Sequence, residues 1–562
     1  MDWLAHNTYI NRVLSRVFIF TILCTCHVIY SSDYEQHTII VKCKPASETF
    51  KSLRKIVPTF WSGSLTREDL TSINSKIDRF FTDYGIVSVK AVKPDADEKP
   101  LAGGVERIFI IQLKDTNSCA VISSLLKTKE FDYAEHDYFI VLDDKEYKSE
   151  LTHSKFISYP NDPHFNEQWG LLNTGQNIEG QYGIPGADIN ILPAWQITTG
   201  NAETIVAILD SGIPHNNPDF EERIVPGYDF VNNDNDPLDD DGHGTAIAGI
   251  IAATGNNGYM ISGINWKCCI LPLKIFDNKG LSQSSNWLRS FVYASDHGAK
   301  VINISSSSSA DINHVMQDAV NYSYSKGSII ITCMGNYNSE IAQYPAAYSN
   351  VISVGALNNI NKRASFSNFG RAIDFIAPGQ GIYSIYYLIP NLIDAWSGTS
   401  MSTAYVSGLV SLMVGLKNDL TFQDVYGLLK KSAKDQIGDP SEDTPGWDKY
   451  YGWGCIDAGK TITALMDTTI THPVPNEYYL KQNYPNPFNL STIIEYGLTA
   501  DQYVNLDIYD VTGSKVITLV NVFQKAGKYI AYWDAYWWAS NIYFCVLRTC
   551  GKTYSKKMIL IK

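Results

Sequence analysis

Between Ser158 and Leu465 the sequence repeats one pattern, a short apolar run that ends in glycine, serine or aspartate and is followed by helical spacing. Continuous apolar runs of this length are typical of strands buried on both faces of a parallel sheet. The clearest runs are TIVAILD, CCILPLKIF, AKVINIS, GSIIITCMG and VISVGA. Their alternation with helices predicts an α/β domain with a mostly parallel sheet over residues 151–467. Ligands of such sheets bind beyond the carboxyl ends of the strands.

The segments on either side have different patterns. Residues 33–150 alternate Ile- and Val-rich strands, such as HTIIVKC and ERIFIIQL, with helical segments at 72–85 and 117–129. This mixture predicts a small α+β domain that closes with the strand FDYAEHDYFIVLDD. Residues 476–562 contain many short strands separated by Gly, Asn and Asp turns, which predicts an all-β sandwich.

The N-terminal residues are typical of a secretory signal. Arg12 and Arg16 precede the apolar run from Val17 to Tyr30, which is short for a membrane span. We therefore expect a signal peptide over residues 1–32, with an uncleaved signal anchor as the alternative. We expect no stable membrane span in the mature protein, since no later segment has the required length and apolar character.

Composition narrows the function classes. The 562 residues carry a formal net charge of −13 without long basic runs, which argues against nucleic acid as a partner. Part of this charge is local, because six aspartates lie within residues 229–241. The ten cysteines contain no CxxC pair, so a zinc site or a thioredoxin-like redox site has little support.

Three polar residues stand where chemistry is expected. Asp210 ends the apolar strand TIVAILD, His243 begins a helix in DGHGTAIAGI, and Ser400 opens a helix in SGTSMSTAYVSG. A serine hydroxyl needs a base to accept its proton, and the base needs a buried anion to orient it. Alone, each residue has an ordinary structural explanation, as a turn, a cap or a helix start. Together, they supply the three roles in the order Asp–His–Ser.

These motifs resemble those of the subtilisin-like serine proteases, or subtilases. The resemblance implies an oxyanion-binding asparagine after a buried strand, and Asn336 in IIITCMGN falls at that position. It implies a secreted serine endopeptidase that hydrolyses protein or peptide substrates through an acyl-enzyme and is matured by removal of a propeptide. The alternative is a catalytically inactive surface protein that uses the same fold for binding.

The sequence departs from the family pattern at three places. The second histidine of the helix motif is replaced by Ala246, which we expect to be a packing position. The serine motif continues Met401-Ser402-Thr403-Ala404-Tyr405 in place of Met-Ala-x-Pro-His. At the Leu-Gly edge that pairs with substrate in the family, this sequence has Ser305-Ser306-Ser307, so the Gly position carries a side chain, which leaves specificity open.

Two segments resemble calcium sites of the family. In the aspartate-rich loop before His243, a thermitase-like calcium loop would use Asp229, Asn232, Asp234 and Asp236, and a solvated acidic loop is the alternative. A second site, which resembles the family's strong calcium site, would pair Asp219 with Asn256. Oxygen donors of this kind suit Ca²⁺, whose expected role is structural.

The flanking domains also resemble parts of secreted proteases. Residues 33–150 resemble subtilase propeptides, which inhibit their own enzyme, with an independent binding domain as the alternative. The series that begins YPNPFNLSTIIEYGL resembles C-terminal sorting domains of bacterial type IX secretion cargo, with a plain appended sandwich as the alternative. These resemblances imply an exported bacterial protein, secreted or at the cell surface, whose C-terminal domain is recognised by secretion machinery.

Overall fold

The computed structural model describes most of the chain after residue 37. The expected signal peptide over residues 1–32 and most of the predicted helix at 72–85 lie outside the described residues. The described ranges are 38–45, 53, 65–66, 82–84, 86–93, 101–114, 118–128, 130–137, 139–141, 145–147, 159–309, 313–387, 392–468, 474–489, 491–535, 538–549 and 551–561.

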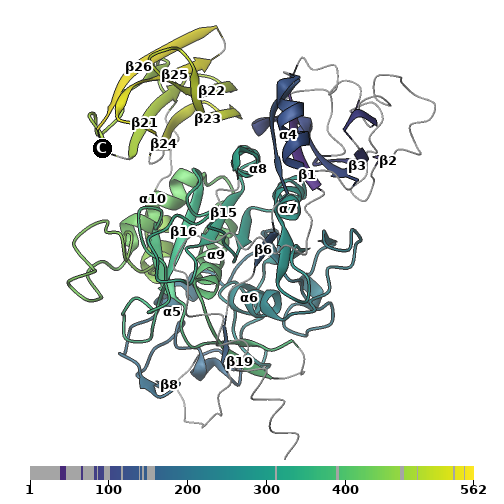
Figure 1. Ribbon diagram of the computed structural model, residues 1–562. Coiled ribbons are helices and arrows are strands. Elements are labelled where there is room, and N and C mark those ends of the chain that lie inside the picture. The colour runs from purple at the N-terminus through teal and green to yellow at the C-terminus, as the bar shows by residue number, and fades with distance from the viewer. Residues whose placement is uncertain are drawn as a thin grey trace, which may run out of the picture. The chain divides into compact units, whose positions relative to one another are not determined.

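A seven-stranded sheet forms the centre of the largest domain (Figure 1). Every neighbouring pair of its strands is parallel, which confirms the α/β fold with a mostly parallel sheet. β12 and β14 flank β10 on opposite sides, so the chain changes direction across the sheet beside the end of β10, where a ligand crevice is expected. The strand order is β11 (Tyr228–Asp229), β12 (Cys269–Lys274), β10 (Ile205–Asp210), β14 (Val301–Ile304), β15 (Ile329–Cys333), β16 (Val351–Leu357) and β17 (Phe375–Pro378).

The continuous apolar strands supply both faces of the sheet. Val206 and Ile208 of β10 join a core cluster that includes α6 (His243–Ala252) and α9 (Thr399–Leu416). Ala207 and Leu209 join a cluster that includes α7 (Ser284–Asp296) and α8 (Asn313–Ser325). Alternate residues of a strand point to opposite faces, so both faces must be apolar where helices cover both. The helices α5 (Ile191–Trp195), α10 (Phe422–Ser432) and α11 (Ala458–Asp467) add to the first cluster.

We expected no segment after the N-terminal apolar run to have the length and apolar character of a membrane span, and one helix contradicts this expectation. Among the described residues, α9 is long and apolar enough to cross a bilayer. Its side chains are nevertheless buried within the protein from Thr399 to Val414. The central helix of an α/β domain is covered on all sides by protein, and it therefore acquires the same composition as a membrane helix.

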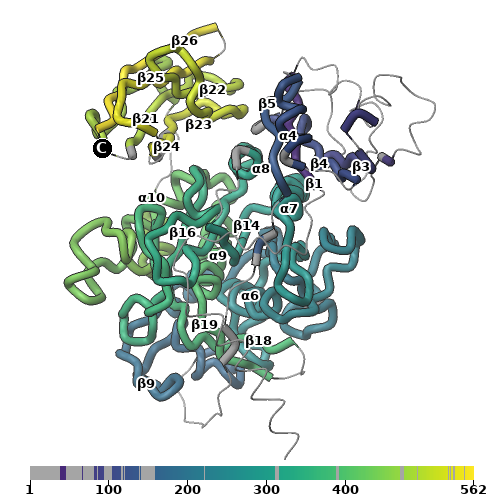
Figure 2. The backbone as a smooth tube through the Cα atoms, in the orientation of Figure 1, coloured from purple at the N-terminus to yellow at the C-terminus, as the bar shows by residue number. Residues whose placement is uncertain are grey.

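The N-terminal domain contains an antiparallel sheet and the helix α4, which confirms the α+β prediction (Figure 2). Its core contains Ile39, Val41, Phe109 and Ile111, all fully buried. The strand order is β2 (Leu65–Thr66), β3 (Ile86–Ala91), β4 (Ile108–Leu113), β1 (Thr38–Cys43) and β5 (Phe131–His136), and the helices are α4 (Ser118–Lys127) and η2 (Ala102–Arg107).

The C-terminal domain contains two antiparallel sheets, which confirms the all-β sandwich. The ring of Trp533 is fully buried and lies 5.4 Å from Phe488 and 5.0 Å from Tyr543, measured between ring centroids. One sheet contains β20 (Tyr479–Leu480), β21 (Ser491–Leu498) and β24 (Gly527–Asp534), and the other contains β23 (Lys515–Gln524), β22 (Gln502–Tyr509), β25 (Asn541–Thr549) and β26 (Lys552–Leu560).

Two short strands after the N-terminal domain pair with strands of the α/β domain. β6 (Phe139–Val141) is antiparallel to β13 (Leu281–Gln283), just before α7. β7 (Lys145–Tyr147) is antiparallel to β19 (Ile393–Ser397), which itself pairs with β18 (Ile382–Ile385). The segment that follows the N-terminal domain therefore reaches the strand that ends three residues before Ser400.

Candidate active site

The carboxylate at the end of β10 contacts the imidazole at the start of α6. Asp210 Oδ1 lies 2.7 Å from His243 Nδ1, and each side chain is 1% exposed. The same oxygen accepts a hydrogen bond from the backbone N–H of Ser211 at 2.8 Å. Contact through Nδ1 makes Nε2 the ring nitrogen that can exchange a proton with another group.

Ser400 lies in the first turn of α9 and is 2% exposed. Its hydroxyl donates to the backbone carbonyl of Ser305 at 2.7 Å, and the hydroxyl of Ser305 donates to the carbonyl of Ser400 at 3.1 Å. These two bonds fix the end of β14 against the start of α9. The Ser400 hydroxyl donates to this backbone oxygen, so that bond must break before an imidazole can accept the proton.

The side chain of Asn336 is anchored beside Ser400. Asn336 Oδ1 accepts hydrogen bonds from the backbone N–H of Thr399 at 2.8 Å and from the Thr399 hydroxyl at 2.9 Å. Thr399 Oγ1 also accepts from the backbone N–H of Gly335 at 3.0 Å. Both bonds end at Oδ1, and the donor hydrogens of this side chain are on Nδ2.

Asp239 is a positioning residue that the sequence analysis did not single out. It lies in the aspartate-rich loop, but its buried carboxylate accepts from the Ser211 hydroxyl at 2.8 Å, from Gly242 N at 2.9 Å and from Thr245 N at 3.0 Å. These bonds tie the residue after Asp210 to the first turn of the helix that carries His243. A buried acceptor with several donors is a fixed structural element rather than a solvated charge.

Lys274 contacts the residue after Asp210 and the aspartate-rich loop before His243. Its buried ammonium donates to the carbonyls of Ser211 at 2.6 Å and Phe276 at 2.8 Å, and it pairs with Asp240. The lysine itself stands in no motif that the sequence analysis identified, although Ser211 and Asp240 belong to the segments around Asp210 and His243. Only the parallel pairing of β10 with β12 brings them together.

An aromatic ring on β19 also contacts the site. The rings of Trp396 and His243 are 6.2 Å apart and inclined at 75°, an edge-to-face arrangement. Trp396 is 6% exposed, and its indole N–H has no hydrogen-bond partner among the described residues. The sequence gives one signal for this residue, its place in WSGTS immediately before the serine motif.

The expected packing role of Ala246 agrees with its surroundings. It is fully buried in α6, and its carbonyl accepts from the hydroxyl of Ser384 at 2.6 Å. Tyr405, which stands in the serine motif where the family pattern has histidine, is also buried within α9.

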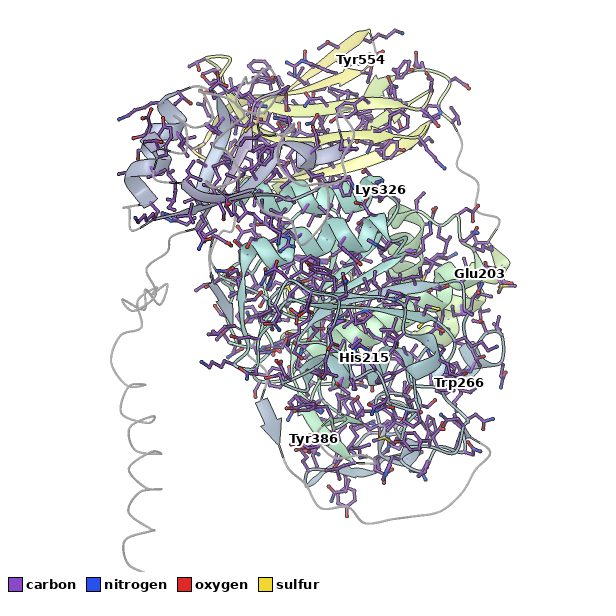
Figure 3. All side chains as sticks on the ribbon, turned by 90° about the vertical axis from the view of Figure 1, so that its right-hand side faces the viewer. Glu203, His215, Trp266, Lys326, Tyr386 and Tyr554 are labelled. Atoms are coloured by element: carbon purple, nitrogen blue, oxygen red, sulfur yellow. The ribbon has the colours of Figure 1, made fainter. Side chains whose placement is uncertain are left out.

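The candidate calcium loop forms hydrogen bonds largely within itself. Asp229 is buried, and its oxygens accept from Asn232 N at 2.8 Å and from Asn232 Nδ2 at 2.9 Å. Asp234 accepts from Asp236 N at 2.9 Å, while Asp236 lies 2.6 Å from Nε2 of the exposed His215, labelled in Figure 3. Asp229 contacts Asn232 and Asp234 contacts Asp236, and Asp229, Asp234 and Asp236 each have at least one carboxylate oxygen bonded to a protein group.

The second candidate site has a different character. Asp219 is fully buried, its Oδ1 accepts from Asn257 Nδ2 at 2.8 Å, and its Oδ2 has no partner among the described residues. Burial raises the pKa of Asp219 to about 7, with the nearby charge of Asp162 acting in the same direction. A desolvated carboxylate with an unused oxygen fits a cation.

The residues around Asp219 differ in part from those predicted. The side-chain oxygen of Asn256 accepts from Asn161 N at 3.2 Å, and Asn257 is the residue that contacts Asp219. Asp162 accepts from the backbone N–H of Asn256 at 2.7 Å. Over the described residues, no group of three or more His, Cys, Asp or Glu side chains is arranged to hold a metal ion.

Asp210 ends strand β10, while His243 and Ser400 lie in the first turns of α6 and α9, and these are the three residue types that serine hydrolases use together. The chain matches the Subtilase family over residues 201–454. It is 34% identical over 303 residues to thermitase from Thermoactinomyces vulgaris, covering 54% of this chain and 99% of thermitase. The chain therefore belongs to the subtilase family and is a subtilisin-like serine endopeptidase.

Further relatives extend the comparison beyond the α/β domain. Identity is 30% over 465 residues with the cell wall-associated protease of Bacillus subtilis (strain 168), covering 79% of this chain and 48% of that protein. Identity is 34% over 270 residues with the thermophilic serine proteinase of Bacillus sp. (strain AK1), covering 48% of this chain and 64% of that protein. Residues 482–562 match a secretion system C-terminal sorting domain. Together these matches assign the protein to the secreted or cell-surface proteins.

Proposed function

We propose that the chain hydrolyses peptide bonds with Ser400 as nucleophile, His243 as general base and Asp210 as the residue that orients His243. The buried contact of 2.7 Å between Asp210 and His243 is the observation that carries the proposal. A carboxylate at Nδ1 fixes the tautomer that can accept a proton at Nε2 and stabilises the imidazolium that forms.

The reaction proceeds in two balanced halves. The Ser400 proton passes to His243 Nε2 while Oγ bonds to the substrate carbonyl carbon, whose oxygen becomes an oxyanion. The C–N bond then breaks, the amine leaves with the proton from His243, and an acyl-enzyme remains. Water repeats the sequence, giving its proton to His243 and its oxygen to the acyl carbon, and Ser400 leaves with the proton.

Asn336 is proposed to donate to the oxyanion. Its anchoring by Thr399 supports this role, because an amide whose oxygen is already committed presents its nitrogen in a fixed orientation. Donors fixed before the reaction stabilise developing charge without a reorganisation cost.

Residues 33–150 are proposed to act as a propeptide that inhibits the enzyme until it is removed. The pairings of β6 with β13 and of β7 with β19 support this role, because they join this segment to the α/β domain, and β19 ends three residues before Ser400. Asp137 adds a buried contact: its carboxylate accepts from the Ser284 hydroxyl at 3.0 Å and from Ser285 N at 2.8 Å, at the start of α7. An anion at a helix N-terminus is favourable.

Salt bridges between the two domains support the same proposal. Lys42 pairs with Asp318 and Lys93 pairs with Asp296, and all four side chains are largely buried. Separation of the domains exchanges these ion pairs for hydrated charges, so the pairs help to hold the N-terminal domain on the α/β domain.

A structural calcium ion is proposed beside Asp219. Asp219 Oδ2 would hold it, with Asp162 as a nearby second carboxylate, and the bound ion would supply charge compensation for a buried anion. The loop from Asp229 to Asp236 fits less well, since its carboxylates already accept protein hydrogen bonds.

The proposed partners are protein or peptide substrates, the chain's own propeptide and, through the C-terminal domain, the secretion machinery. The sorting-domain match over residues 482–562 supports the last of these.

The test is labelling by a serine-reactive fluorophosphonate. Native, processed protein in calcium should be labelled at Ser400, and the Ser400→Ala chain should keep residues 33–150 attached because self-cleavage is lost. Ser402→Ala is the matched control, since its hydroxyl lies in the same helix but contacts the carbonyls of Ala377 and Pro378. Unlabelled wild-type protein would favour the alternative of an inactive surface-binding protein.

A further inference from the structure

The C-terminal sandwich contacts two other domains at one place. Strand β23, at the edge of its sheet, contacts helix α8 of the α/β domain and helix η2 of the N-terminal domain, and η2 and α8 also contact each other. We call the place where β23, α8 and η2 meet the three-domain junction. The strand that lies against the enzyme therefore also lies against the proposed propeptide.

Buried apolar side chains from all three elements belong to one cluster. Val105 of η2, Met316 of α8 and Leu519 of β23 are each at most 6% exposed. The free energy of burial scales with the apolar area that is removed from water. Side chains that share a cluster lose part of their burial when one of the elements leaves, so burial favours the assembled junction.

Tyr503 of β22 makes a polar contact between the sandwich and the N-terminal domain. It stands opposite Phe523 of β23, and its hydroxyl lies 3.3 Å from the backbone carbonyl of Leu101, the residue before η2. The hydroxyl also lies 3.2 Å from the carbonyl of Asn521 in β23, so it can donate its one proton to either domain. The Leu101 carbonyl accepts from Gly104 N–H at 2.9 Å, which fixes it in the first turn of η2.

Charged groups of the other two domains lie near this hydroxyl. The pKa of Tyr503 is raised to about 12, chiefly by burial. The negative charges of Glu106 in η2 and Asp318 in α8 act in the same direction, and Arg107 opposes them. Asp318 itself pairs with Lys42 of the N-terminal domain. Tyr503 is therefore a neutral donor placed where all three domains meet.

The sandwich has a separate contact with α8 that does not involve the N-terminal domain. Tyr529 of β24 stacks on Tyr496 of β21, with 5.5 Å between the ring centroids. Burial raises the pKa of Tyr324 near the end of α8, and the neighbouring Tyr529 acts in the same direction. The sandwich can therefore stay on α8 while the N-terminal domain leaves. A surface held next to its partner acts at a high effective concentration, so even a weak contact slows departure.

We propose that the edge of the sandwich formed by β23, together with Tyr503, is a second binding surface for the N-terminal domain, which binds the first turn of η2 and slows release of that domain after cleavage. This inference rests on the proposed function, because it gives the proposed propeptide a second partner within the same chain. It makes the sandwich part of the inhibited state, in addition to its match to a sorting domain.

The test follows release of residues 33–150 from the full chain after it has cleaved itself. Excess fluorophosphonate is added once cleavage is complete on a gel. Each freed Ser400 is then labelled and can no longer digest the N-terminal domain of another molecule, so the labelling rate reports release. Tyr503→Phe should be labelled about two- to fivefold faster than the wild type, because one shared hydrogen bond is lost. Tyr503→Ala, which also removes the ring, should be labelled about tenfold faster.

Tyr509→Phe and Tyr509→Ala are the matched controls. Tyr509 stands on the same strand, and its hydroxyl bonds Asp507 of the sandwich itself at 3.0 Å, so both variants should be labelled at the wild-type rate. A second measurement does not depend on catalysis: in the uncut Ser400→Ala chain, amide hydrogen exchange over residues 101–107 should rise with Tyr503→Ala and not with Tyr509→Ala. Tyr503 is 38% exposed, so its removal leaves the core of the sandwich in place.

The outcomes separate the inference from the proposed function on which it rests. Slow labelling of the cleaved wild type at a rate that Tyr503→Ala does not change overturns the inference and leaves the inhibitory role of residues 33–150 intact. Unchanged exchange over residues 101–107 in Tyr503→Ala also overturns the inference. Immediate labelling of the cleaved wild type overturns the inhibitory role, and the inference falls with it.

Discussion

The anchoring of Asn336 by Thr399 makes a prediction about rate. Thr399→Val keeps the shape of the side chain but removes the hydroxyl, which donates to Asn336 Oδ1 at 2.9 Å and accepts from Gly335 N–H at 3.0 Å. Asn336 then keeps one anchor, the backbone N–H of Thr399 at 2.8 Å. The amide remains in place but is less well oriented, so part of its stabilisation of the oxyanion is lost.

The magnitude follows from the bonds removed. Loss of the whole oxyanion donor in a subtilisin, a member of the same family, costs about 3–4 kcal/mol, which sets the upper limit. One neutral hydrogen bond is worth about 1 kcal/mol, and an unsatisfied Gly335 N–H adds a similar cost to stability. We expect kcat to fall about 5- to 30-fold with KM nearly unchanged.

The assay is a double-mutant cycle on kcat, with active sites counted by fluorophosphonate labelling. Thr399→Val is measured in the wild type and in Asn336→Ala, where its effect should nearly vanish if it acts through Asn336. Thr403→Val serves as the control, because its hydroxyl bonds the carbonyl of Thr399 one turn away and does not contact Asn336. An equal loss in both backgrounds would refute the reasoning.

Three further predictions concern calcium, inhibition and the imidazole. Burial raises the pKa of Asp219 to about 7, so calcium-free protein should bind more protons folded than unfolded, and its Tm should fall as pH rises from about 4 to 7. Calcium should abolish this slope, whereas Asp219→Asn should lose both the slope and the response to calcium; a slope that persists in Asp219→Asn would contradict this. Asp137→Asn should shorten the lag before activation of the refolded full-length chain about tenfold, because it removes the anion at the start of α7, and an unchanged lag would count against that role. Trp396→Leu should lower kcat about two- to tenfold, since it removes the edge-to-face contact with His243; a kcat equal to that of the wild type would exclude an orienting role.

The fold was predictable because its signals are local. Strands such as Ile205–Asp210 are apolar on both faces, and this composition identifies a buried parallel strand without any tertiary information. The reason that α9 also meets the criteria for a membrane helix is the same: full burial, whether in lipid or protein, selects the same residues. Length and composition cannot separate the two environments.

The catalytic candidates were found through their neighbours in sequence, and the supporting residues were not. Asp210, His243 and Ser400 each stand in a glycine- and serine-rich motif at the end of a strand or the start of a helix. Lys274 and Trp396 act through contacts with residues distant in the chain, and Lys274 meets Ser211 across 63 residues. Similarly, one position separates Asn256 from Asn257, and only the backbone conformation decides which amide contacts Asp219.

The aspartate-rich loop shows why local charge density is an ambiguous signal for metal binding. Asp236 contacts His215, Asp240 pairs with Lys274, and Asp239 accepts donors from both the Asp210 and the His243 segments. These bonds compensate the carboxylates without an ion. A carboxylate that accepts hydrogen bonds from backbone N–H groups and a carboxylate that binds a metal ion come from the same residue type. The spacing of aspartates in the sequence therefore does not distinguish the two roles. Among the six predicted ligands, Asp219 has a buried oxygen without a partner in the described residues, which distinguishes it from the buried Asp229, whose two oxygens both accept hydrogen bonds.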